Sequence, residues 1–482
     1  MVADQQSSVG DFLNSAGNAA QVIQNHVAKG DFVSVISHLD ADGLAAAGIL
    51  GCVLNRLDAA FRIRIAKQMD ESITNELASE GAPLYVFSDF GGGSLDLFKE
   101  KLCGRDIVVL DHHQPVNVSF PGLIHVNPHL HGFDGAREIA GSGVAYFTAK
   151  AINPSNIDLA YLAIVGALGD MQDRNKRREL YSLNELVMKD AVDAGYLKTE
   201  MDLIFYGRET RPIYKALACT TNPFIPGLSG EEDKSLGFLV NLGISLKVNE
   251  RWRAVSDLSS DEKQKLLSQL IAHLVSRGIS GDVAMTLVGT VYILAKEDRW
   301  TPLRDAREYA SLLNACGRMD KAGLGVAICI GGRGKTLDEA QEVLNQYRRT
   351  LAQYMDWLTE APGRFQEIEN AYVVRGEGVI NERLLGAVST ILTTTGLFQQ
   401  TKPIIALTIA SDGGVKVSAR ATNQLIKDGL NLGVILQTAA EKVGGRGGGH
   451  DIAAGAQIAR GSEDEFLVIT SQLIKKQLKR EK

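Results

Sequence analysis

The stretch FVSVISHLDADGLAAAGILGCVL, residues 32–54, decides the fold class. Its apolar half, 32–37, predicts a buried strand, and its half rich in small residues, 43–54, predicts a helix that follows directly. Two further apolar strands are predicted at 84–88 and 107–110. Short apolar strands that alternate with helices indicate a mainly parallel sheet with helices on both faces.

The composition is that of an ordinary globular chain. The 482 residues suffice for two to four domains of roughly 100–200 residues each. Apolar residues make up 45% and charged residues 22%, which excludes disordered and collagen-like classes. No apolar run reaches the ~18–20 residues of a membrane span, and no signal-peptide pattern opens the chain, so we expect a cytoplasmic protein with no membrane partner. The five scattered cysteines form no CxxC pair, which gives no indication of disulfides or thiolate zinc.

The net charge of −6 is unevenly distributed along the chain. Residues 1–200 hold 25 acidic against 16 basic side chains, whereas residues 364–482 hold 15 basic against 12 acidic ones. This balance argues against a generic polycation that coats nucleic acid. An acidic first part and a basic last part suit a cation site and an anion-binding surface, but ordinary solvated faces explain the asymmetry equally well.

The chain divides at two places. A charged turn at 173–178 closes the strand-and-helix block, and Ala361-Pro362-Gly363 is the best linker candidate. We therefore predict three parts: a catalytic domain at 1–200, a mainly helical insertion and connector at 201–360, and a smaller α/β domain for substrate binding at 361–482. Strands of the last part are predicted near 371–375, 403–410, 415–420 and 453–459.

The first cluster of polar residues follows the strand at 32–37. If the chain stays extended there, His38, Asp40 and Asp42 point to the same side, so that one imidazole and two carboxylates converge. Such ligands suit a divalent ion such as Mn²⁺ or Mg²⁺. The alternative is that Asp42 caps the following helix. This would account for Asp42 but not for His38 and Asp40.

Four more clusters follow an apolar strand or the Ala/Leu-rich segment 159–168, which is more typical of a buried helix. In parallel sheets ligands bind outside the carboxyl ends of the strands, so we expect these side chains to gather at one edge. For the Asn-Pro pair a simple turn is at least as probable as a substrate contact. The clusters contribute Asp89, then Asp111 with His112 and His113, then Asn127 with His129, and Asp170.

The gathered residues suit two-metal chemistry. Two divalent cations roughly 3.5–4 Å apart, bridged by one carboxylate, would neutralise the cluster and activate water for attack on phosphorus. Without metal, so many carboxylates in one cleft would repel one another and shift their pKa values. Hydrolysis of phosphate esters is therefore the expected reaction class.

A glycine-rich loop, VGGRGGGH at 443–450, is the sixth cluster. Such a loop can aim backbone N–H groups at a phosphate while charged side chains add donors, and Arg420 could add a bidentate phosphate contact. The alternative is a flexible hairpin-like loop. The residues expected to bind substrate here are Arg446, Gly447, Gly448, Gly449 and His450.

Together these motifs closely resemble those of the DHH phosphoesterase superfamily. The resemblance rests on SHLDADG at 37–43, SD at 88–89, DHH at 111–113 and GD at 169–170, with GGGH at 447–450 resembling the loop of the associated C-terminal domain. Within the superfamily, the length and the stretch PLRDAREYA at 302–310 look most like the archaeal RecJ-like nucleases.

The resemblance implies an α/β fold: an N-terminal DHH domain with a mainly parallel sheet flanked by helices, and a smaller α/β DHH-associated domain. It implies two Mn²⁺ ions, with Mg²⁺ as a possible substitute. One ion would be held by His38, Asp40 and Asp89, and the other by Asp42, Asp89, His112 and Asp170.

The resemblance also implies roles around the ions. Asp111 would orient a histidine ligand, and His113 would contact the scissile phosphate or donate a proton to the leaving oxygen. Arg420 and the loop around His450 would grip a neighbouring phosphate or the strand end.

The function expected from the resemblance is a metal-dependent exonuclease that hydrolyses single-stranded DNA or RNA to mononucleotides in replication or repair. Two alternatives stay open: a phosphodiesterase for nano-oligonucleotides or cyclic dinucleotides, and a Cdc45-like scaffold that binds the GINS replication complex. A silent scaffold has no need for six metal ligands, and all six are present. No equivalent of the OB-fold of bacterial RecJ is evident, and aromatic residues make up only 6% of the chain.

Overall fold

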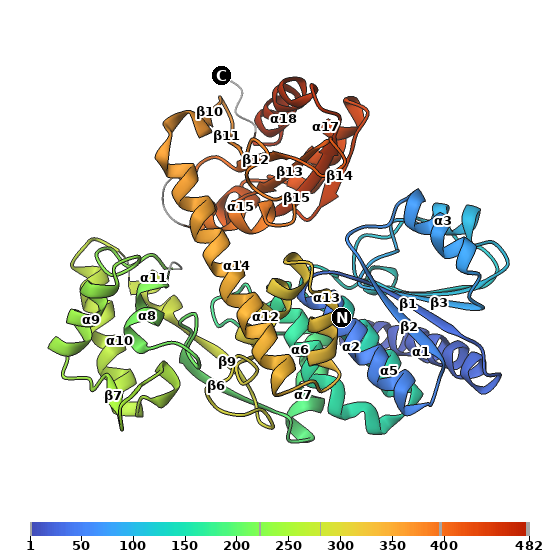
Figure 1. The fold of residues 1–482 in the computed structure, drawn as a ribbon, viewed down its shortest axis with the longest axis horizontal. Helices are drawn as coiled ribbons and strands as arrows, with labels where there is room; N and C mark the ends of the chain where they lie inside the picture. The colour runs from blue at the N-terminus through green and yellow to red at the C-terminus, as the bar shows by residue number, and fades with distance from the viewer. Residues whose placement is uncertain (1, 221–222, 280, 395–397, 479–482) are drawn as a thin grey trace. The chain divides into compact units, whose positions relative to one another are not determined.

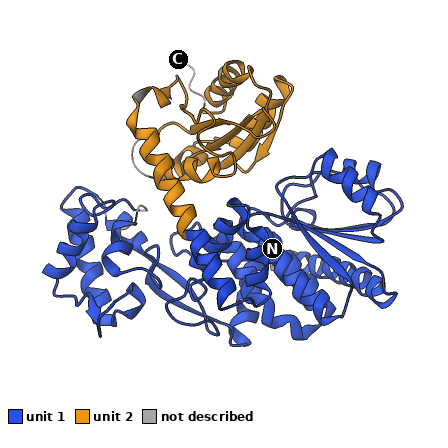
Figure 2. Cartoon of the chain, viewed as in Figure 1, with its two compact units in different colours: residues 1–344 blue, residues 345–482 orange. Residues whose placement is uncertain are grey.

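The computed structural model describes residues 2–220, 223–279, 281–394 and 398–478. The chain packs into two compact units, Met1–Leu344 and Asn345–Lys482 (Figures 1 and 2). The helix α14 (Lys335–Glu360) carries the chain from the first unit into the second.

A five-stranded sheet with the order β2-β1-β3-β4-β5 forms the centre of the first unit, and all four strand pairs are parallel. This confirms the predicted mainly parallel sheet. The three predicted strands are present to within one residue, whereas β2 and β5 were not predicted because they are edge strands with partly exposed side chains. The strands are β1 (Val33–His38), β2 (Phe61–Ala66), β3 (Leu84–Ser88), β4 (Asp106–Leu110) and β5 (Leu123–Val126).

Helices cover both faces of this sheet. Alternate strand residues such as Ile36, Phe87 and Val109 share one core with Leu77 and Phe98 of the helices on one face. The helices on that face are α3 (Glu71–Glu80) and α4 (Leu95–Lys101). The other face carries α1 (Val2–Ala28), α2 (Ala41–Arg56) and α5 (Gly141–Ile152), with α6 (Ala160–Gly169) packed on α2 and α5 and α7 (Leu183–Asp193) on α6 (Figure 1).

The register of the sheet brings four strand ends to the same level. Cross-strand neighbours at the carboxyl edge are Ser37, Ser88, Leu110 and Val126. The residues that follow them therefore lie side by side at this edge: His38, the last residue of β1, and Asp89, Asp111 and Asn127, which come directly after their strands.

An antiparallel pair, β6 (Leu197–Leu203) and β9 (Val288–Leu294), leads out to a segment dominated by helices. This segment has its own core, which includes Leu217, Leu239 and Leu266. Its elements are α8 (Ile213–Ala218), α9 (Glu232–Asn241), the hairpin of β7 (Lys247–Val248) and β8 (Arg251–Trp252), α10 (Ser260–Val275) and α11 (Gly281–Ala284).

The stretch 302–310 forms the start of α12 (Ala306–Arg318), which is followed by α13 (Ala322–Cys329). Asp305 caps α12 by accepting hydrogen bonds from the N–H groups of Arg307 and Glu308. The Arg307 guanidinium in turn binds the buried carboxylate of Asp173 at 2.6 and 3.0 Å. This end of α12 therefore fixes the loop that follows α6.

The same helix also contacts two other loops. The Glu308 carboxylate accepts a hydrogen bond from the Glu209 N–H at 2.8 Å, at the entrance to the helical segment. Further along α12, the side-chain oxygen of Asn314 accepts a hydrogen bond from the Ala41 N–H at 3.2 Å, at the first turn of α2. One helix thus supports the beginning of α2, the loop after α6 and the inserted segment.

The second unit contains a mixed sheet of six strands, ordered β10-β11-β12-β13-β15-β14. Its helices α17 (Leu432–Lys442) and α18 (Glu463–Gln477) share one core with the strands, and α15 (Leu385–Thr394) packs on β12 and β13. The short α16 (Asn423–Lys427) precedes α17. The strands are β10 (Phe365–Glu367), β11 (Tyr372–Arg375), β12 (Ile404–Ile409), β13 (Val415–Arg420), β14 (Arg446–Gly449) and β15 (Ala453–Ile458).

The glycine-rich stretch was expected to be a loop and is instead largely the edge strand β14, paired antiparallel with β15. Close packing explains part of its composition, because a Cβ at Gly447 would lie 2.5 Å from the carbonyl oxygen of Leu436 in α17. Among the described residues, no helix is both long and apolar enough to cross a membrane.

Replacing Gly317 tests how closely α12 packs against the motif SHLDADG at residues 37–43. A Cβ at this position would lie 1.6 Å from the carbonyl oxygen of Leu39, so the helix or the loop must move. We expect Gly317→Ala to lower the free energy of unfolding by roughly 1–3 kcal/mol, measured by urea denaturation.

Gly323→Ala is the matched control, because no atom lies within 4 Å of the added Cβ in the next helix, α13. It should be neutral or stabilising by up to about 1 kcal/mol. Equal stability of the two variants would contradict the close contact between α12 and the loop.

Candidate metal centre

A first group of donors forms where β1 and β3 end. The His38 Nδ1 atom lies 3.0 Å from an oxygen of Asp40 and 3.5 Å from Oδ2 of Asp89. One ligand atom from each of these three residues lies within 4.8 Å of the others, which is close enough to surround a single ion.

A second group lies next to the first. The His112 Nε2 atom lies 3.3 Å from Oδ2 of Asp170 and 3.7 Å from Oδ2 of Asp42. These ligand atoms also lie within 4.8 Å of one another. Two separate sets of three donors therefore share one edge of the sheet.

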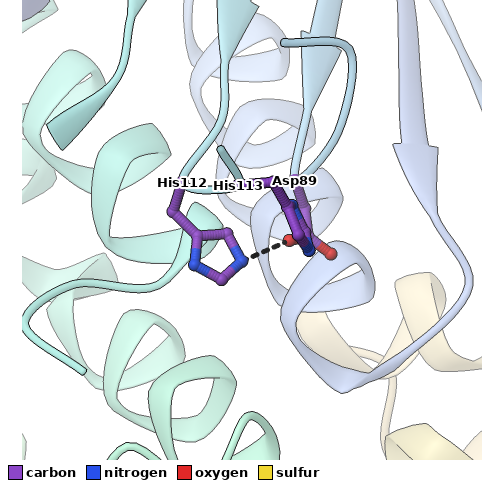
Figure 3. Close-up of side chains that lie close together, drawn as sticks. All are labelled: Asp89, His112 and His113. Atoms are coloured by element: carbon purple, nitrogen blue, oxygen red, sulfur yellow. Dashed lines mark ion pairs between the residues drawn. The ribbon is translucent and has the colours of Figure 1, made fainter. Parts of the chain in front are cut away.

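Asp89 joins the two groups. Its Oδ2 faces His38, whereas its Oδ1 lies 3.2 Å from His112 Nε2, the contact drawn in Figure 3. Asp89 is buried, and neither of its oxygens receives a hydrogen bond from a residue that the structure describes. A buried carboxylate without donors is costly, so this arrangement fits a carboxylate that binds cations with both oxygens.

The backbone of Asp89 adopts a left-handed conformation with φ of 61°. This conformation is unfavourable for a residue other than glycine, and such strain persists where the surroundings enforce it, often at functional sites. Gly141 packs against this residue so closely that a Cβ there would lie 2.8 Å from the Cα of Asp89.

Asp42 is oriented by the N-terminus of α5. Its carboxylate accepts hydrogen bonds from the N–H groups of Gly141 at 2.6 Å and Ser142 at 3.0 Å, and from the Ser142 hydroxyl. A helix N-terminus is a favourable position for a carboxylate. In α6, a Cβ at Gly166 would lie 2.3 Å from the same carboxylate, so the pocket around Asp42 has no room for a larger residue.

His112 is fixed in a similar way. Its Nδ1 donates a hydrogen bond to the carbonyl oxygen of Gly135 at 2.7 Å, and this leaves Nε2 as the ring atom that meets the carboxylates. A ligating histidine usually has such a partner on its second nitrogen.

Asp111 holds the neighbouring histidine. One of its oxygens accepts hydrogen bonds from the His112 and His113 N–H groups and from Nδ1 of His113 at 2.8 Å, while the other accepts from the Gly92 N–H. Although burial opposes ionisation, the charge and hydrogen bond of His113 hold the pKa of Asp111 well below its usual range. The half-exposed His113 also has a ring atom within 4.8 Å of donors on Asp89 and His112 (Figure 3).

The carboxylates of the centre repel one another. Burial and the charges of Asp42 and Asp40 raise the pKa of Asp89, and burial with the charge of Asp42 raises that of Asp170. Asp40 behaves differently, since against the effect of burial the adjacent His38 lowers its pKa. Four carboxylates thus outnumber the three nearby imidazoles of His38, His112 and His113, an imbalance that divalent cations would relieve.

The predicted alignment of His38, Asp40 and Asp42 on an extended segment is wrong, and so is the alternative in which Asp42 caps the helix. The helix α2 begins at Ala41, Asp40 caps it by accepting a hydrogen bond from the Gly43 N–H at 3.1 Å, and Asp42 lies in the first turn. Asp42 therefore points to the group of His112, whereas His38 and Asp40 belong to the other group.

Asn127 and His129 lie beside the centre in different roles. Asn127 is fully buried, accepts a hydrogen bond from the His129 N–H at 3.0 Å and donates one to the His113 carbonyl at 2.9 Å. These contacts favour the Asn-Pro turn, the alternative interpretation of this residue. His129 is only partly buried, and burial lowers its pKa.

The predicted substrate contacts of the second unit are built on its sheet. Arg420 ends β13, where its guanidinium donates to the Thr390 hydroxyl at 3.0 Å and to the Ala419 carbonyl at 2.8 Å. Arg446 is exposed on the edge strand β14, and His450 follows that strand in a turn closed by its N–H and the Ala453 carbonyl.

Several supporting residues were missed from the sequence, among them Ser142, Gly141, Gly135 and Asn314. Each contacts a motif residue from a distant part of the chain. The glycine and serine pattern at 141–143, GSG, is the one local signal that marks a helix start able to receive a carboxylate.

Comparison with known proteins places the chain in a family. Residues 205–288 match the DHH-CID domain and residues 370–476 match the DHHA1 domain. The protein MJ0831 of Methanocaldococcus jannaschii is 32% identical over 456 residues, which cover 93% of this chain and 94% of that protein. The single-stranded-DNA-specific exonuclease RecJ of Salmonella typhimurium is 22% identical, with 94% of this chain and 68% of that protein covered.

Two solved structures share the fold. RecJ from Thermus thermophilus in complex with Mn²⁺ aligns with a TM-score of 0.58 and 18% identity over 96% of this chain. This chain spans about half, 55%, of that RecJ. Cdc45 from Entamoeba histolytica aligns with a TM-score of 0.64 and 12% identity, over 95% of this chain and 99% of that one. The chain therefore belongs to the DHH phosphoesterase superfamily, as a RecJ-like member.

Proposed function

We propose that this protein is a metal-dependent exonuclease that hydrolyses single-stranded DNA or RNA to mononucleotides. The observation that carries the proposal is the position of Asp89 between two groups of metal-ligand type, with one oxygen facing each group. A bridging carboxylate between two cation positions is the geometry that two-metal hydrolysis of phosphodiesters requires.

The residues present fit two divalent cations. His38, Asp40 and Asp89 would hold one, and Asp42, Asp89, His112 and Asp170 would hold the other. Bound cations of this kind neutralise phosphate oxygens and lower the pKa of water. We propose Mn²⁺, with Mg²⁺ as a substitute, since imidazole and carboxylate ligands suit Mn²⁺.

The chain itself supplies orientation and proton transfer. Ser142 and Gly141 hold the carboxylate of Asp42 in place, and the carbonyl of Gly135 holds the ring of His112. Asp111 fixes His113 through its Nδ1, so His113 can contact the scissile phosphate or give a proton to the leaving oxygen.

The printed description of the Salmonella relative supports the substrate class, because that protein is a single-stranded-DNA-specific exonuclease. We assign polymer grip to the second unit, through Arg420, Arg446 and the stretch up to His450, where N–H groups and cationic side chains suit phosphates. We further propose that the protein acts in the cytoplasm, in replication or repair, with the GINS complex as a partner.

A second candidate function follows from the fold that is shared with Cdc45: a replisome scaffold without catalysis. Three further carboxylates and two imidazoles held around Asp89 have no purpose in such a scaffold, and this favours the enzyme. The third candidate, a phosphodiesterase for nano-oligonucleotides or cyclic dinucleotides, would use the same centre, so only the length of the substrate distinguishes it from the exonuclease.

Digestion of end-labelled strands tests the activity. With Mn²⁺ we expect mononucleotide release from DNA or RNA of about 20 nucleotides, faster than turnover of a dinucleotide because a polymer offers more contacts. Asp89→Asn and Asp42→Ala should reduce the rate by more than the roughly 10–100-fold typical of a supporting residue.

Asp96→Asn is the matched control, since Asp96 is an exposed carboxylate on α4 of the same domain. It should cleave at the rate of the parent protein. Mononucleotide release that is undiminished in the Asp42→Ala variant, or no release from any strand, would contradict the proposed nuclease activity. Faster turnover of the dinucleotide would assign the protein to the small-substrate class instead.

Mn²⁺ titration by calorimetry tests the centre without any substrate. We expect two ions per chain, and Ser142→Ala should weaken binding of one of them by roughly 10–100-fold, because Asp42 loses the hydroxyl donor that helps to orient its carboxylate.

Ser34→Ala is the comparison for Ser142→Ala. Ser34 is equally buried in β1, and its hydroxyl has no hydrogen-bond partner among the described residues. It should leave both Mn²⁺ affinities unchanged. Identical titrations for Ser142→Ala and the parent protein would show that the Ser142 hydroxyl does not orient Asp42.

A further inference from the structure

Three aromatic rings lie exposed or half-exposed near the β7–β8 hairpin, outside the candidate metal centre. Two of the three tryptophans of the chain are among them, and Trp252 and Trp300 are 38% and 47% exposed. Exposed aromatic side chains that gather in one region, rather than singly, are candidates for a binding site. The rings of Tyr214 and Trp252 lie 5.2 Å apart and are tilted by 56°.

Each tryptophan has basic groups at its ring. The Lys247 ammonium lies 4.7 Å from the centre of the Trp252 ring. The guanidinium groups of Arg251 and Arg299 lie 4.1 and 5.0 Å from the ring centre of Trp300. We call these six residues, which lie in two groups around the hairpin, the tryptophan surface: Tyr214, Lys247 and Trp252 form one group, and Arg251, Arg299 and Trp300 form the other.

The hairpin explains how the surface is assembled. Lys247 pairs with Trp252 across the two strands, so both side chains lie on the same face. Arg251 is next to Trp252 in sequence and therefore points to the opposite face, toward Trp300. The tight turn between the strands has positive φ angles at Asn249 and Glu250, 47° and 64°, which the two-residue turns of hairpins require.

One carboxylate holds the Trp300 half of the surface in position. Asp257 accepts hydrogen bonds from Arg251 at 3.0 Å, from Arg299 at 3.1 Å and from the Trp300 indole N–H at 3.0 Å. The Asp257 side chain is only 9% exposed, whereas the two arginine side chains are 42% and 50% exposed. The cations and the ring therefore face solvent, while their counter-charge lies beneath them.

We propose that the tryptophan surface binds single-stranded nucleic acid. Stackable rings beside cationic groups are the combination that single strands need, because bases stack on the rings and phosphates pair with the cations. This inference rests on the proposed function and extends it: the surface would give the nuclease a second grip on the strand, outside the metal centre.

The probe is fluorescein-labelled oligo(dT) of about 20 nucleotides, titrated into the full chain with EDTA so that no cleavage occurs. We expect binding by anisotropy together with quenching of tryptophan fluorescence. The double variant Trp252→Ala/Trp300→Ala should raise the Kd by at least roughly 5- to 150-fold, the range for loss of one stacked base, and abolish most of the quenching.

Trp357→Phe is the matched control. Trp357 also carries an arginine on its ring, Arg364 at 3.9 Å, but lies on α14 outside the tryptophan surface. Its variant should keep both the affinity and the quenching.

Lys247→Gln provides a second variant that removes one exposed charge and no ring. It should reduce the slope of log affinity against log salt by about 0.7, the value for one phosphate contact with a single strand. Thermal midpoints show that each variant is folded.

The outcomes separate this inference from the proposed function. Cleavage by the parent protein with an oligo(dT) affinity that none of these variants changes would overturn the tryptophan surface and leave the nuclease standing. Binding that depends on Trp252 and Trp300 in a protein that cleaves nothing would support the tryptophan surface and overturn the proposed nuclease activity. Binding of poly-glutamate that these variants lose, with oligo(dT) affinity unchanged, would assign the surface to an acidic protein partner and overturn the proposal.

Discussion

The repulsion among four carboxylates at one edge of a parallel sheet is the constraint on which the structure of the first unit depends. Asp89 is buried between two imidazoles, and burial together with neighbouring charges raises its pKa. Holding such groups together requires supports that cannot relax, and the chain provides them as helix termini and glycine contacts. The N-terminus of α5 orients Asp42, and Gly166 leaves no free space behind it.

The sequence allowed the fold and the composition of the site to be predicted because both depend on local patterns. Apolar strands followed by polar residues marked the carboxyl edge of the sheet, and the parallel register places His38, Asp89 and Asp111 in one row. The pattern of residues alone predicted two bridged cations at this edge and placed His38, Asp40 and Asp42 together. Which donors belong to which ion was expected only from the resemblance to the DHH superfamily.

The remaining features could not be predicted because they depend on contacts between distant segments. Ser142 meets Asp42 across 100 positions of sequence, and the GSG pattern at 141–143 marks a helix start without indicating which carboxylate it receives. The tryptophan surface is similarly hidden, because its hairpin strands have two residues each and Trp300 joins from a separate loop. The glycine-rich stretch was wrongly predicted to be a loop for a related reason. Close packing of β14 against α17 requires small residues whether or not a phosphate binds.

The position of α12 has a consequence for how such chains can be recombined. Glu308 binds the entrance of the DHH-CID segment, and Asn314 on the same helix binds the first turn of α2. The inserted segment is therefore not an accessory that can be exchanged alone. A chimaera that exchanges the inserted segment but keeps the original α12 would lose the contact between Glu308 and that segment. Natural or engineered exchanges of the segment should therefore succeed only when α12 is transferred together with it.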